Sequence, residues 1–135
     1  MDTDTIQHLT HLLVGSVCTE VSLEGGYLII LFGTHGLTIG CVWRLIQGEG
    51  ICVGSNSDAT LQAQFPALLI GQRVRQVALV SDCHDLRVEF DQGMILETFA
   101  DSEQYEHWHV GGGPNEMIIA GPEKLWSSFW PVSAA

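Results

Sequence analysis

Hydrophobic and polar positions follow the same pattern twice along this chain. Leu12-Leu13-Val14-Gly15 recurs 56 residues later as Leu68-Leu69-Ile70-Gly71, and Val21 then matches Val77. In each copy, apolar residues at helical spacing give way to apolar residues at every second position, which is the spacing of a half-buried strand. Because the matched positions suit apolar side chains and turn glycines, the repeat predicts an architecture and not a chemistry.

The first copy predicts one helix and three strands within about residues 4–44. Asp4 or Thr5 can cap a helix that runs to Gly15, where a C-terminal glycine cap is expected. Strands are expected at residues 17–23, 27–32 and 37–43, with turns at residues 24–26 and 33–36.

The second copy predicts the same elements within about residues 58–99. Residues 48–60 are rich in Gly, Ser, Asn and Asp and are expected to connect the copies, with a short strand at residues 51–53. Pro66 suits the first turn of a helix over residues 67–70. Strands are expected at residues 74–80, 86–90 and 94–99. A polar loop over residues 81–85 and a hairpin turn over residues 91–93 connect them.

The C-terminal part, residues 105–131, has no counterpart in the first copy. Residues 108–110 and 117–120 predict a hairpin. A short helix is expected to follow, from Pro122 or Glu123 to about Trp130.

The two copies are expected to merge into one domain over residues 1–135. An isolated three-stranded unit leaves one face poorly covered, so two such units gain by packing together. We therefore expect an α+β fold in which two tandem repeats of a helix and three strands form a mixed, mainly antiparallel sheet or a partial barrel with pseudo-twofold symmetry.

Composition adds a surplus of apolar residues to this picture. Hydrophobic residues make up 46% of the 135 residues and charged residues only 16%. Part of the surplus is expected to lie against a partner or a second copy, although a thick core with a Gly-rich surface is the alternative. No apolar run approaches the ~20 residues of a membrane span, and the N-terminus lacks the positive charge of a secretory signal. We expect a cytoplasmic protein whose four cysteines are free thiols.

The charge is strongly negative, with sixteen acidic and five basic residues and a formal net charge of −11. Direct binding to nucleic acid is disfavoured, because neutralising phosphates requires clustered Lys and Arg. The acidic residues concentrate between residues 82 and 106, where only Arg87 opposes them. Such a surface would attract a basic protein. Solubility alone is the competing explanation.

The candidate chemical groups do not form a recognised site. His107 and His109 lie on one face of a predicted strand and could ligate zinc if Cys83-His84-Asp85 approached them. The close-spaced Cys or His pairs of structural zinc sites are missing, so we expect no metal and no cofactor. No spacing indicates a nucleophile with a base and an orienting carboxylate, so we do not expect an enzyme.

The second half of the chain carries a resemblance to a known family. Its most distinctive element is Tyr105-Glu106-His107-Trp108, a Tyr-Glu-x-Trp motif. The other matching positions are Leu69, Gly71, Val74, Val77, Leu86, Phe90, Gly93, Leu96, Ile119-Ala120-Gly121-Pro122, Leu125 and Trp126. Over about half its length, the sequence resembles a bacterial family of small, largely uncharacterised proteins with members among the immunity proteins of polymorphic and type VI secreted toxins.

Together, the resemblance, the acidic charge and the lack of a catalytic arrangement predict an immunity protein that binds and neutralises a cognate toxin. A basic nuclease is the favoured toxin, because its cationic groups would complement the acidic surface. The residues expected to contact the toxin are Asp82, Asp85, Asp101, Glu103, Glu106, Trp126 and Trp130. Two alternatives stay open: a homodimeric small-ligand-binding module of the bacterial cytoplasm, and a hydrolase that uses His84, His107 or His109.

Overall fold

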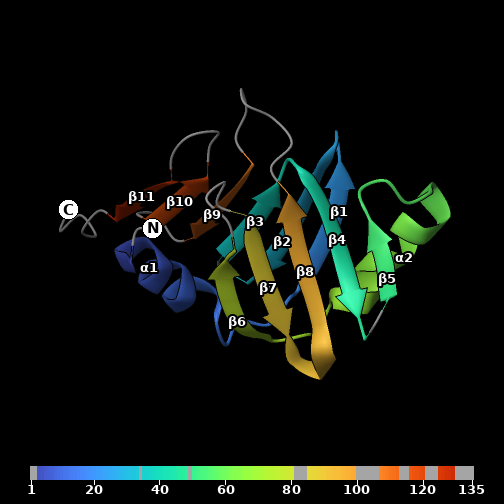
Figure 1. The fold of residues 1–135 in the computed structure, drawn as a ribbon, viewed down its shortest axis with the longest axis horizontal. Helices are drawn as coiled ribbons and strands as arrows, with labels where there is room; N and C mark the ends of the chain where they lie inside the picture. The colour runs from blue at the N-terminus through green and yellow to red at the C-terminus, as the bar shows by residue number, and fades with distance from the viewer. Residues whose placement is uncertain are drawn as a thin grey trace.

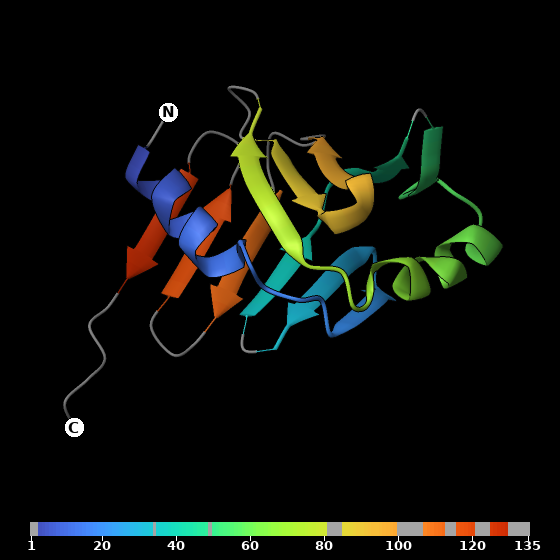
Figure 2. The ribbon, with the colours of Figure 1, turned by 90° about the horizontal axis from the view of Figure 1, so that it is seen from below.

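Two antiparallel β-sheets face each other, and a helix lies at each end of the pair (Figures 1 and 2). The computed structural model describes residues 3–33, 35–48, 50–80, 85–99, 107–112, 116–120 and 125–129. The first sheet has the strand order β1 (Glu20–Glu24), β2 (Tyr27–Phe32), β3 (His35–Ile39), β9 (Trp108–Gly112), β10 (Glu116–Ala120) and β11 (Leu125–Phe129). The second sheet has the order β5 (Gly50–Gly54), β4 (Val42–Gln47), β8 (Met94–Phe99), β7 (Leu86–Phe90) and β6 (Val74–Leu79).

Each sheet combines strands from both halves of the chain. In the first sheet, the β1-β2-β3 meander is extended at β3 by the β9-β10 hairpin, with Ile39 opposite Trp108. In the second sheet, the β6-β7-β8 meander is extended at β8 by the β4-β5 hairpin, with Trp43 opposite Thr98. The chain therefore has to pass from one sheet to the other between β3 and β4, and again between β8 and β9.

The helices close the open ends of this pair of sheets (Figure 2). Helix α1 (Thr3–Leu13) packs against β6, the edge strand of the second sheet. Helix α2 (Ala59–Leu69) packs against β1, the edge strand of the first sheet, and against β5. An edge strand that is covered by a helix is protected from pairing with another chain.

Backbone hydrogen bonds join the two segments that follow the helices. The Gly15 N–H donates to the Val74 carbonyl, and the Gly71 N–H donates to the Cys18 carbonyl, both at 2.8 Å. Both glycines have positive φ, +90° for Gly15 and +91° for Gly71, which side-chain-bearing residues rarely adopt. Each glycine thus ends its helix and turns the chain toward the other half.

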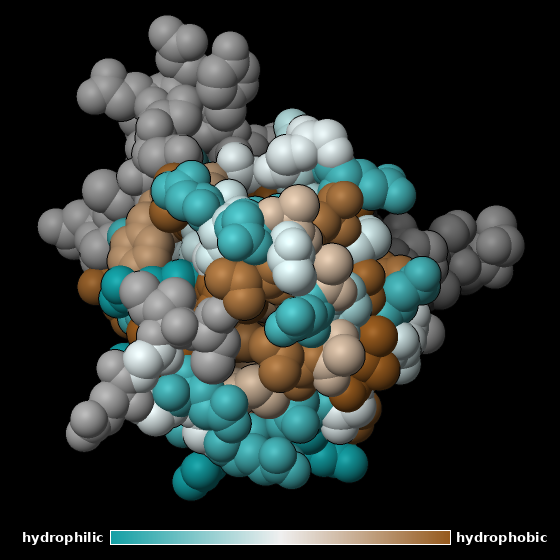
Figure 3. Space-filling view, turned by 90° about the vertical axis from the view of Figure 1, so that its right-hand side faces the viewer, coloured by the Kyte–Doolittle hydropathy of each residue, from teal (hydrophilic) through white to brown (hydrophobic). Residues whose placement is uncertain are grey.

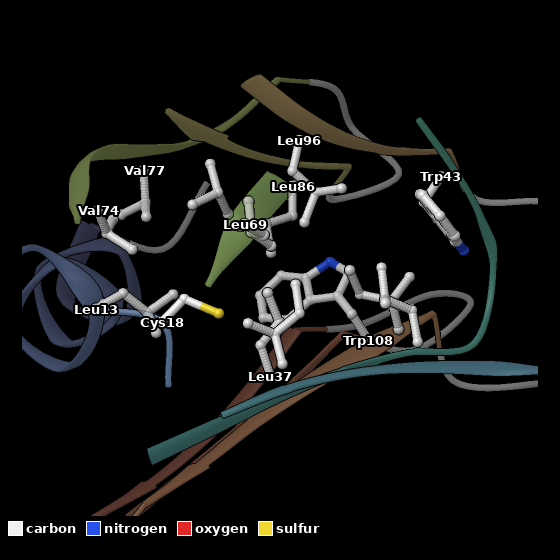
Figure 4. Close-up of a cluster of buried hydrophobic side chains, with 14 of the residues drawn as sticks. Leu13, Cys18, Leu37, Trp43, Leu69, Val74, Val77, Leu86, Leu96 and Trp108 are labelled. Carbon is white, nitrogen blue, oxygen red and sulfur yellow. The ribbon is translucent and has the colours of Figure 1, made fainter. Parts of the chain in front are cut away.

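The core lies between the sheets and is built around Trp108 (Figure 4). Trp108 is only 1% exposed and lies beside Leu37, with Leu86 and Leu96 facing it from the second sheet (Figure 4). A second tryptophan, Trp43, packs edge-on against Phe65 of α2, with ring centroids 4.8 Å apart. Buried aromatic side chains contribute large apolar areas, so these contacts dominate the packing energy.

Several sequence predictions are confirmed. The α+β class and the antiparallel strands are as expected, and the strands over β2, β7 and β8 begin and end at the predicted residues. The connecting segment contains the short strand β5, and the C-terminal part contains the β9-β10 hairpin. The predicted single sheet or partial barrel is wrong, because the strands form two sheets.

The predicted third strand, residues 37–43, is two strands. Strand β3 runs from His35 to Ile39. The turn before it is therefore shorter than the expected residues 33–36. Strand β4 then starts at Val42 in the other sheet. At the crossing, the Gly40 N–H donates to the His107 carbonyl at 2.8 Å. Alternation of apolar residues continues through the crossing, so it gave no sign that the strand changes sheets.

The second helix was also placed wrongly. Pro66 lies inside α2, and the helix starts after Asp58, whose Oδ1 accepts a hydrogen bond from the Leu61 N–H at 2.9 Å. This side chain satisfies one of the first N–H groups of the helix. The prediction treated residues 48–60 as a connection and so overlooked the helix cap within them.

The predicted C-terminal helix is the strand β11, which pairs with β10. The backbone of β11 pairs with that of β10, with Ile119 opposite Trp126. A four-residue spacing over so short a segment cannot separate helix from strand. Aromatic residues favour strands, and here that preference agrees with the pairing.

Replacing Pro66 with Ala tests the position of α2. Proline has no N–H to donate to the Gln62 carbonyl and strains the helix interior. We expect Pro66→Ala to raise the free energy of unfolding by about 1–2 kcal/mol, after allowing for the more flexible unfolded chain, as measured by urea denaturation. Ala63→Pro, at an exposed position of the same helix, should lower the free energy by about 3 kcal/mol. Neutral effects of both changes would contradict the observed helix.

Candidate functional site

Within the part of the chain that the structure describes, no helix crosses the outer face of the second sheet (Figure 1). Alternate residues of β4 and β8 point to this face and are partly exposed, while their neighbours are buried in the core. The outward side chains are Val42, Arg44 and Ile46 of β4 and Ile95, Glu97 and Phe99 of β8. The face thus mixes apolar and charged groups, as protein-binding surfaces do.

An ion pair crosses the centre of this face. Arg44 and Glu97 are opposite each other in the β4-β8 register, and Arg44 Nε lies 3.0 Å from Glu97 Oε1. The guanidinium also lies 4.8 Å from the centroid of the Phe99 ring, a cation–π distance. Since both side chains of the pair are partly exposed, the pair contributes only about 0.2–1 kcal/mol. Its main effect is to hold the Arg44 guanidinium over the Phe99 ring.

A pocket of about 510 Å³ opens beside this ion pair. Its lining is formed by Val42, Trp43, Arg44, Gly54, Ser55, Asn56, Ser57 and Phe99. This volume lies within the ~300–1,000 Å³ range of small-molecule sites. We refer to it as the Arg44 pocket. Its mostly apolar lining and single cationic side chain suit an apolar or aromatic group that carries a polar edge.

The rim of the Arg44 pocket is fixed by hydrogen bonds. The Gly54 N–H donates to Ser57 Oγ at 2.9 Å, and the Ser55 N–H donates to the Trp43 carbonyl at 3.0 Å. Gln62 Nε2 of α2 donates to the Ser55 carbonyl at 3.0 Å. A Cβ atom at Gly54 would lie 3.0 Å from the Trp43 carbonyl oxygen, so a side chain here would push this carbonyl away by a few tenths of an ångström. The pocket is therefore largely preformed.

A smaller hollow of about 190 Å³ lies on the same sheet, over β6 and β7. It is lined by Gln76, Val77, Ala78, Val80, Arg87 and Glu89. Arg75 approaches Glu89 at 3.9 Å, which is a weak contact between exposed groups. Both hollows lie along the second sheet, which marks it as the surface to consider for binding.

All five strands of the second sheet have one end where the Arg44 pocket lies. Because neighbouring strands are antiparallel, β5, β6 and β8 end there, and β4 and β7 begin there. We call this the pocket end. The acidic residues predicted to contact a partner follow directly from these strand ends in the sequence. Asp82 and Asp85 lie between β6 and β7, and Asp101 and Glu103 come after β8.

Only part of the predicted contact set lies within the described residues. Asp85 is half-buried beside the start of β7, and its carbonyl accepts a hydrogen bond from the Val80 N–H at 2.9 Å. The backbone of Trp126 lies in β11, on the first sheet, so it is not on the same sheet as Asp85. Outside the described residues are Asp82, Asp101, Glu103, Glu106 and Trp130. Their roles stay predictions.

Sequence reasoning missed the Arg44 pocket and its ion pair. The alternation of Val42, Arg44 and Ile46 marks one strand face, which the sequence does show. The partner Glu97 is 53 positions away, and the pairing depends on β4 leaving the first sheet to join β8. No local pattern carries that information.

The groups considered for metal binding or nucleophilic chemistry do not gather in the described part of the chain. His107 is buried and His109 is partly exposed, on β9 or next to it. Cys83 and His84 lie outside the described residues. Among the residues that are described, no group of three or more His, Cys, Asp and Glu side chains could hold a metal ion.

Cys18 is a buried thiol with suppressed reactivity. It is 1% exposed, and burial raises its pKa from 9.0 to about 11, opposed in part by a backbone hydrogen bond at Glu20. A thiol must lose its proton to act as a nucleophile. Cys18 therefore stays protonated at neutral pH and serves the core.

The helices do not suit a bilayer. Both α1 and α2 have 11 residues, and no helix in the described ranges combines the length and apolar character that crossing a membrane requires.

The fold is that of a two-sheet α+β protein with one sheet face open beside a preformed pocket. By comparison with known families, the chain belongs to the family of unknown function DUF6188, whose model matches residues 6–124. No curated protein and no solved structure matches the chain.

The pKa of Cys18 predicts a loss of stability in alkali. The unfolded chain releases the thiol proton near pH 9, whereas the folded protein keeps it until about pH 11. The unfolded state then binds fewer protons, so the free energy of unfolding falls as the pH rises through this window. The loss approaches roughly 1.4 kcal/mol for each unit of pKa shift.

Urea denaturation of the wild type and of Cys18→Ala at a series of pH values would measure this effect. Below pH 9 the difference in free energy of unfolding between the two proteins should be constant. Between pH 9 and 11 it should shrink, because only the wild type loses this contribution. A difference that stays constant up to pH 11 would contradict the assignment.

Proposed function

We propose that this protein is a non-enzymatic immunity protein of the bacterial cytoplasm that binds and neutralises a cognate antibacterial toxin, with a basic nuclease as the toxin. The observation that supports it best is that Asp85 lies beside the start of β7 at the pocket end, within a stretch of sequence that is rich in acidic residues. An uncovered sheet face beside a preformed pocket is suited to receiving a partner. The resemblance around Tyr105-Glu106-His107-Trp108 supports the same class.

The charge balance suits a basic partner. Five basic residues stand against sixteen acidic ones, and two of the five, Arg44 and Arg75, are paired with Glu97 and Glu89. The excess negative charge would steer a cationic protein toward the surface and raise the rate of association. The acidic side chains that would pair with cationic groups of the nuclease are Asp82, Asp85, Asp101, Glu103 and Glu106.

Apolar anchors would add affinity to this electrostatic attraction. The Arg44 pocket can receive one apolar or aromatic side chain of the toxin, and such central anchors dominate binding energy in protein interfaces. Trp126 and Trp130 are proposed as further anchors from this protein. Binding would occupy the toxin, and no bond is made or broken.

We also propose that the two halves are copies of one unit, related by a pseudo-twofold axis at the bridge between Val17 and Arg73. Reciprocal hydrogen bonds support this: Cys18 N–H to the Gln72 carbonyl at 2.9 Å, and Val74 N–H to the Ser16 carbonyl at 2.8 Å. Each bond is the counterpart of the other under a shift of 56 residues.

The strand order extends the proposed unit beyond the three predicted strands. Trp108 on β9 is placed against β3 in the way that Trp43 on β4 is placed against β8. A unit of one helix and five strands would therefore occur twice, with β11 as an addition. In this proposal the second sheet took on the binding role, since the Arg44 pocket opens on it and Asp85 lies beside its strand β7.

A second candidate is a small-ligand-binding module, which the size of the Arg44 pocket favours. Native mass spectrometry of protein purified from its own host would separate the two functions. The second candidate predicts a bound molecule of defined mass that is lost when Val42→Trp fills the pocket. The immunity proposal predicts that no such molecule is present.

The identity of the neighbouring gene tests the class directly. We expect a large secreted protein with a variable C-terminal nuclease domain to be encoded immediately upstream. That domain should kill bacteria when expressed alone and spare them when this protein is co-expressed. A metabolic operon at this position would contradict the proposal.

Charge reversal at the pocket end should weaken binding to this toxin domain. The triple change Asp82→Lys, Asp85→Lys and Asp101→Lys takes the net charge from −11 to −5, since each reversal adds two charges. We expect at least a ~10-fold loss of affinity by calorimetry, mainly through slower association, because rim charges act on the on-rate. Protection of cells should fall in parallel.

A matched control variant has the same net charge of −5, with its three charge reversals placed away from the pocket end. Glu20 and Glu24 lie exposed on β1 of the first sheet, and Asp91 lies exposed at the opposite end of the second sheet. The triple change of these residues to Lys should leave the affinity within about twofold of the wild type once salt screens the general charge. Equal losses from both triples would show that overall charge, and not the pocket end, controls binding.

A further inference from the structure

The exposed face of α2 carries no charged side chain. Seven residues of the helix are exposed, and they are Ala59, Thr60, Leu61, Ala63, Gln64, Ala67 and Leu68. Leu61 is 42% exposed and Leu68 is 37% exposed, and Ile70, directly after the helix, is 47% exposed. A surface helix normally places charged residues on the side away from the core. This helix therefore departs from the pattern of a solvated surface element.

Hydrophobic side chains gather on this end of the molecule (Figure 3). The view faces the end formed by α2 and β5, and brown side chains occupy its middle with teal ones around them. The buried side of α2, with Phe65 and Leu69, is already packed against the core. The outer apolar side is thus available to a second molecule.

We propose that the outer face of α2 is the contact between two copies of this protein. The charge of the chain favours this occupant over a toxin. Two copies that each carry −11 repel one another wherever acidic surfaces meet, and like charges in contact cost several kcal/mol. A face without charges is where two such copies can approach. A basic toxin, in contrast, would find no electrostatic attraction on an uncharged helix.

The copies meet around a twofold axis that crosses the middle of α2, so the two helices are antiparallel. Asp58 is the charged residue that caps the helix start. In the antiparallel arrangement the two Asp58 residues lie at opposite ends, roughly 18 Å apart along the helix axis, beyond the ~8 Å screening length at physiological salt. A parallel arrangement would bring them together. Closed twofold dimers are also the commonest assembly of identical chains.

The expected dimer is weak and reversible. Stable complexes bury about 800 Å² on each partner, and one face of an 11-residue helix offers less. The dimer leaves the second sheet uncovered, because α2 lies at the end of the molecule and not over the sheet (Figure 1). Self-association through α2 is therefore independent of the proposed toxin binding.

Analytical ultracentrifugation over micromolar to near-millimolar concentrations tests the proposal. The wild type should show a monomer–dimer equilibrium that strengthens as salt screens the repulsion between copies. Leu68→Glu and Leu68→Lys should each raise the dimer dissociation constant about tenfold or more, although they change the charge in opposite directions. Val14→Glu, at a residue 38% exposed directly after α1, is the matched control and should behave as the wild type.

Crosslinking tests the antiparallel arrangement separately. Gln64 is at the midpoint of α2, so Gln64→Cys should lie opposite its own copy and form a disulfide-linked dimer on oxidation. Thr60→Cys, one turn earlier, would be separated from its copy by roughly 12 Å and should not crosslink. Wild type treated in the same way accounts for the native cysteines.

Three results would overturn the proposal. The first is a wild type that stays monomeric at all concentrations. The second is a dimer that Leu68→Lys strengthens, which would show that charge and not apolar contact governs association. The third is a dimer that both Leu68 variants leave intact while circular dichroism shows an unchanged fold.

Discussion

The structure depends on one constraint: each sheet is completed by strands from the other half of the chain. The β4-β5 hairpin, from the first half, joins the second sheet at β8, and the β9-β10 hairpin, from the second half, joins the first sheet at β3. Trp43 lies in β4 and Trp108 lies in β9, which are the strands that make these joins, and both side chains are buried. Neither half can complete its sheet alone, so folding requires contacts between distant parts of the chain.

The placement of the helices leaves the outer face of the second sheet without a covering helix (Figure 1). The two helices are used to cover the gaps at the ends of the sheet pair, where α1 packs against β6 and α2 against β1. No helix is left to cover the outer face of the second sheet, so its side chains must tolerate water. The Arg44–Glu97 pair and the Phe99 ring do this by combining charge with an apolar surface. The same combination makes the face and its pocket suited to binding.

The sequence predicted the elements that local patterns control. The hairpin strands β7 and β8 and the glycine that follows each helix could be assigned, because a turn or a cap marks their ends. Elements that depend on distant partners were missed: the change of sheet after Ile39 and the strand pairing of β11. Helix α2 is a different case: Asp58 is a residue type that caps helices, whereas the preference of proline for the first helical turn predicts a start at Pro66, which is too late.

The candidate site likewise has one part that local sequence predicts and one part that depends on contacts between distant segments. The acidic segments could be predicted from composition, and Asp85 is indeed beside the start of β7. The Arg44 pocket could not be predicted, because its walls come from β4, β8 and the turn after β5. These segments become neighbours only through the strand exchange.

The central claim is that this protein acts by binding a basic toxin at the pocket end of the second sheet. Hydrogen–deuterium exchange of the protein, alone and mixed with the toxin domain encoded beside it, tests this claim most directly. The account predicts slower exchange in the complex at the start of β4, the end of β8 and the loop between β6 and β7. Slower exchange confined to the first sheet, or no change at all, would contradict it.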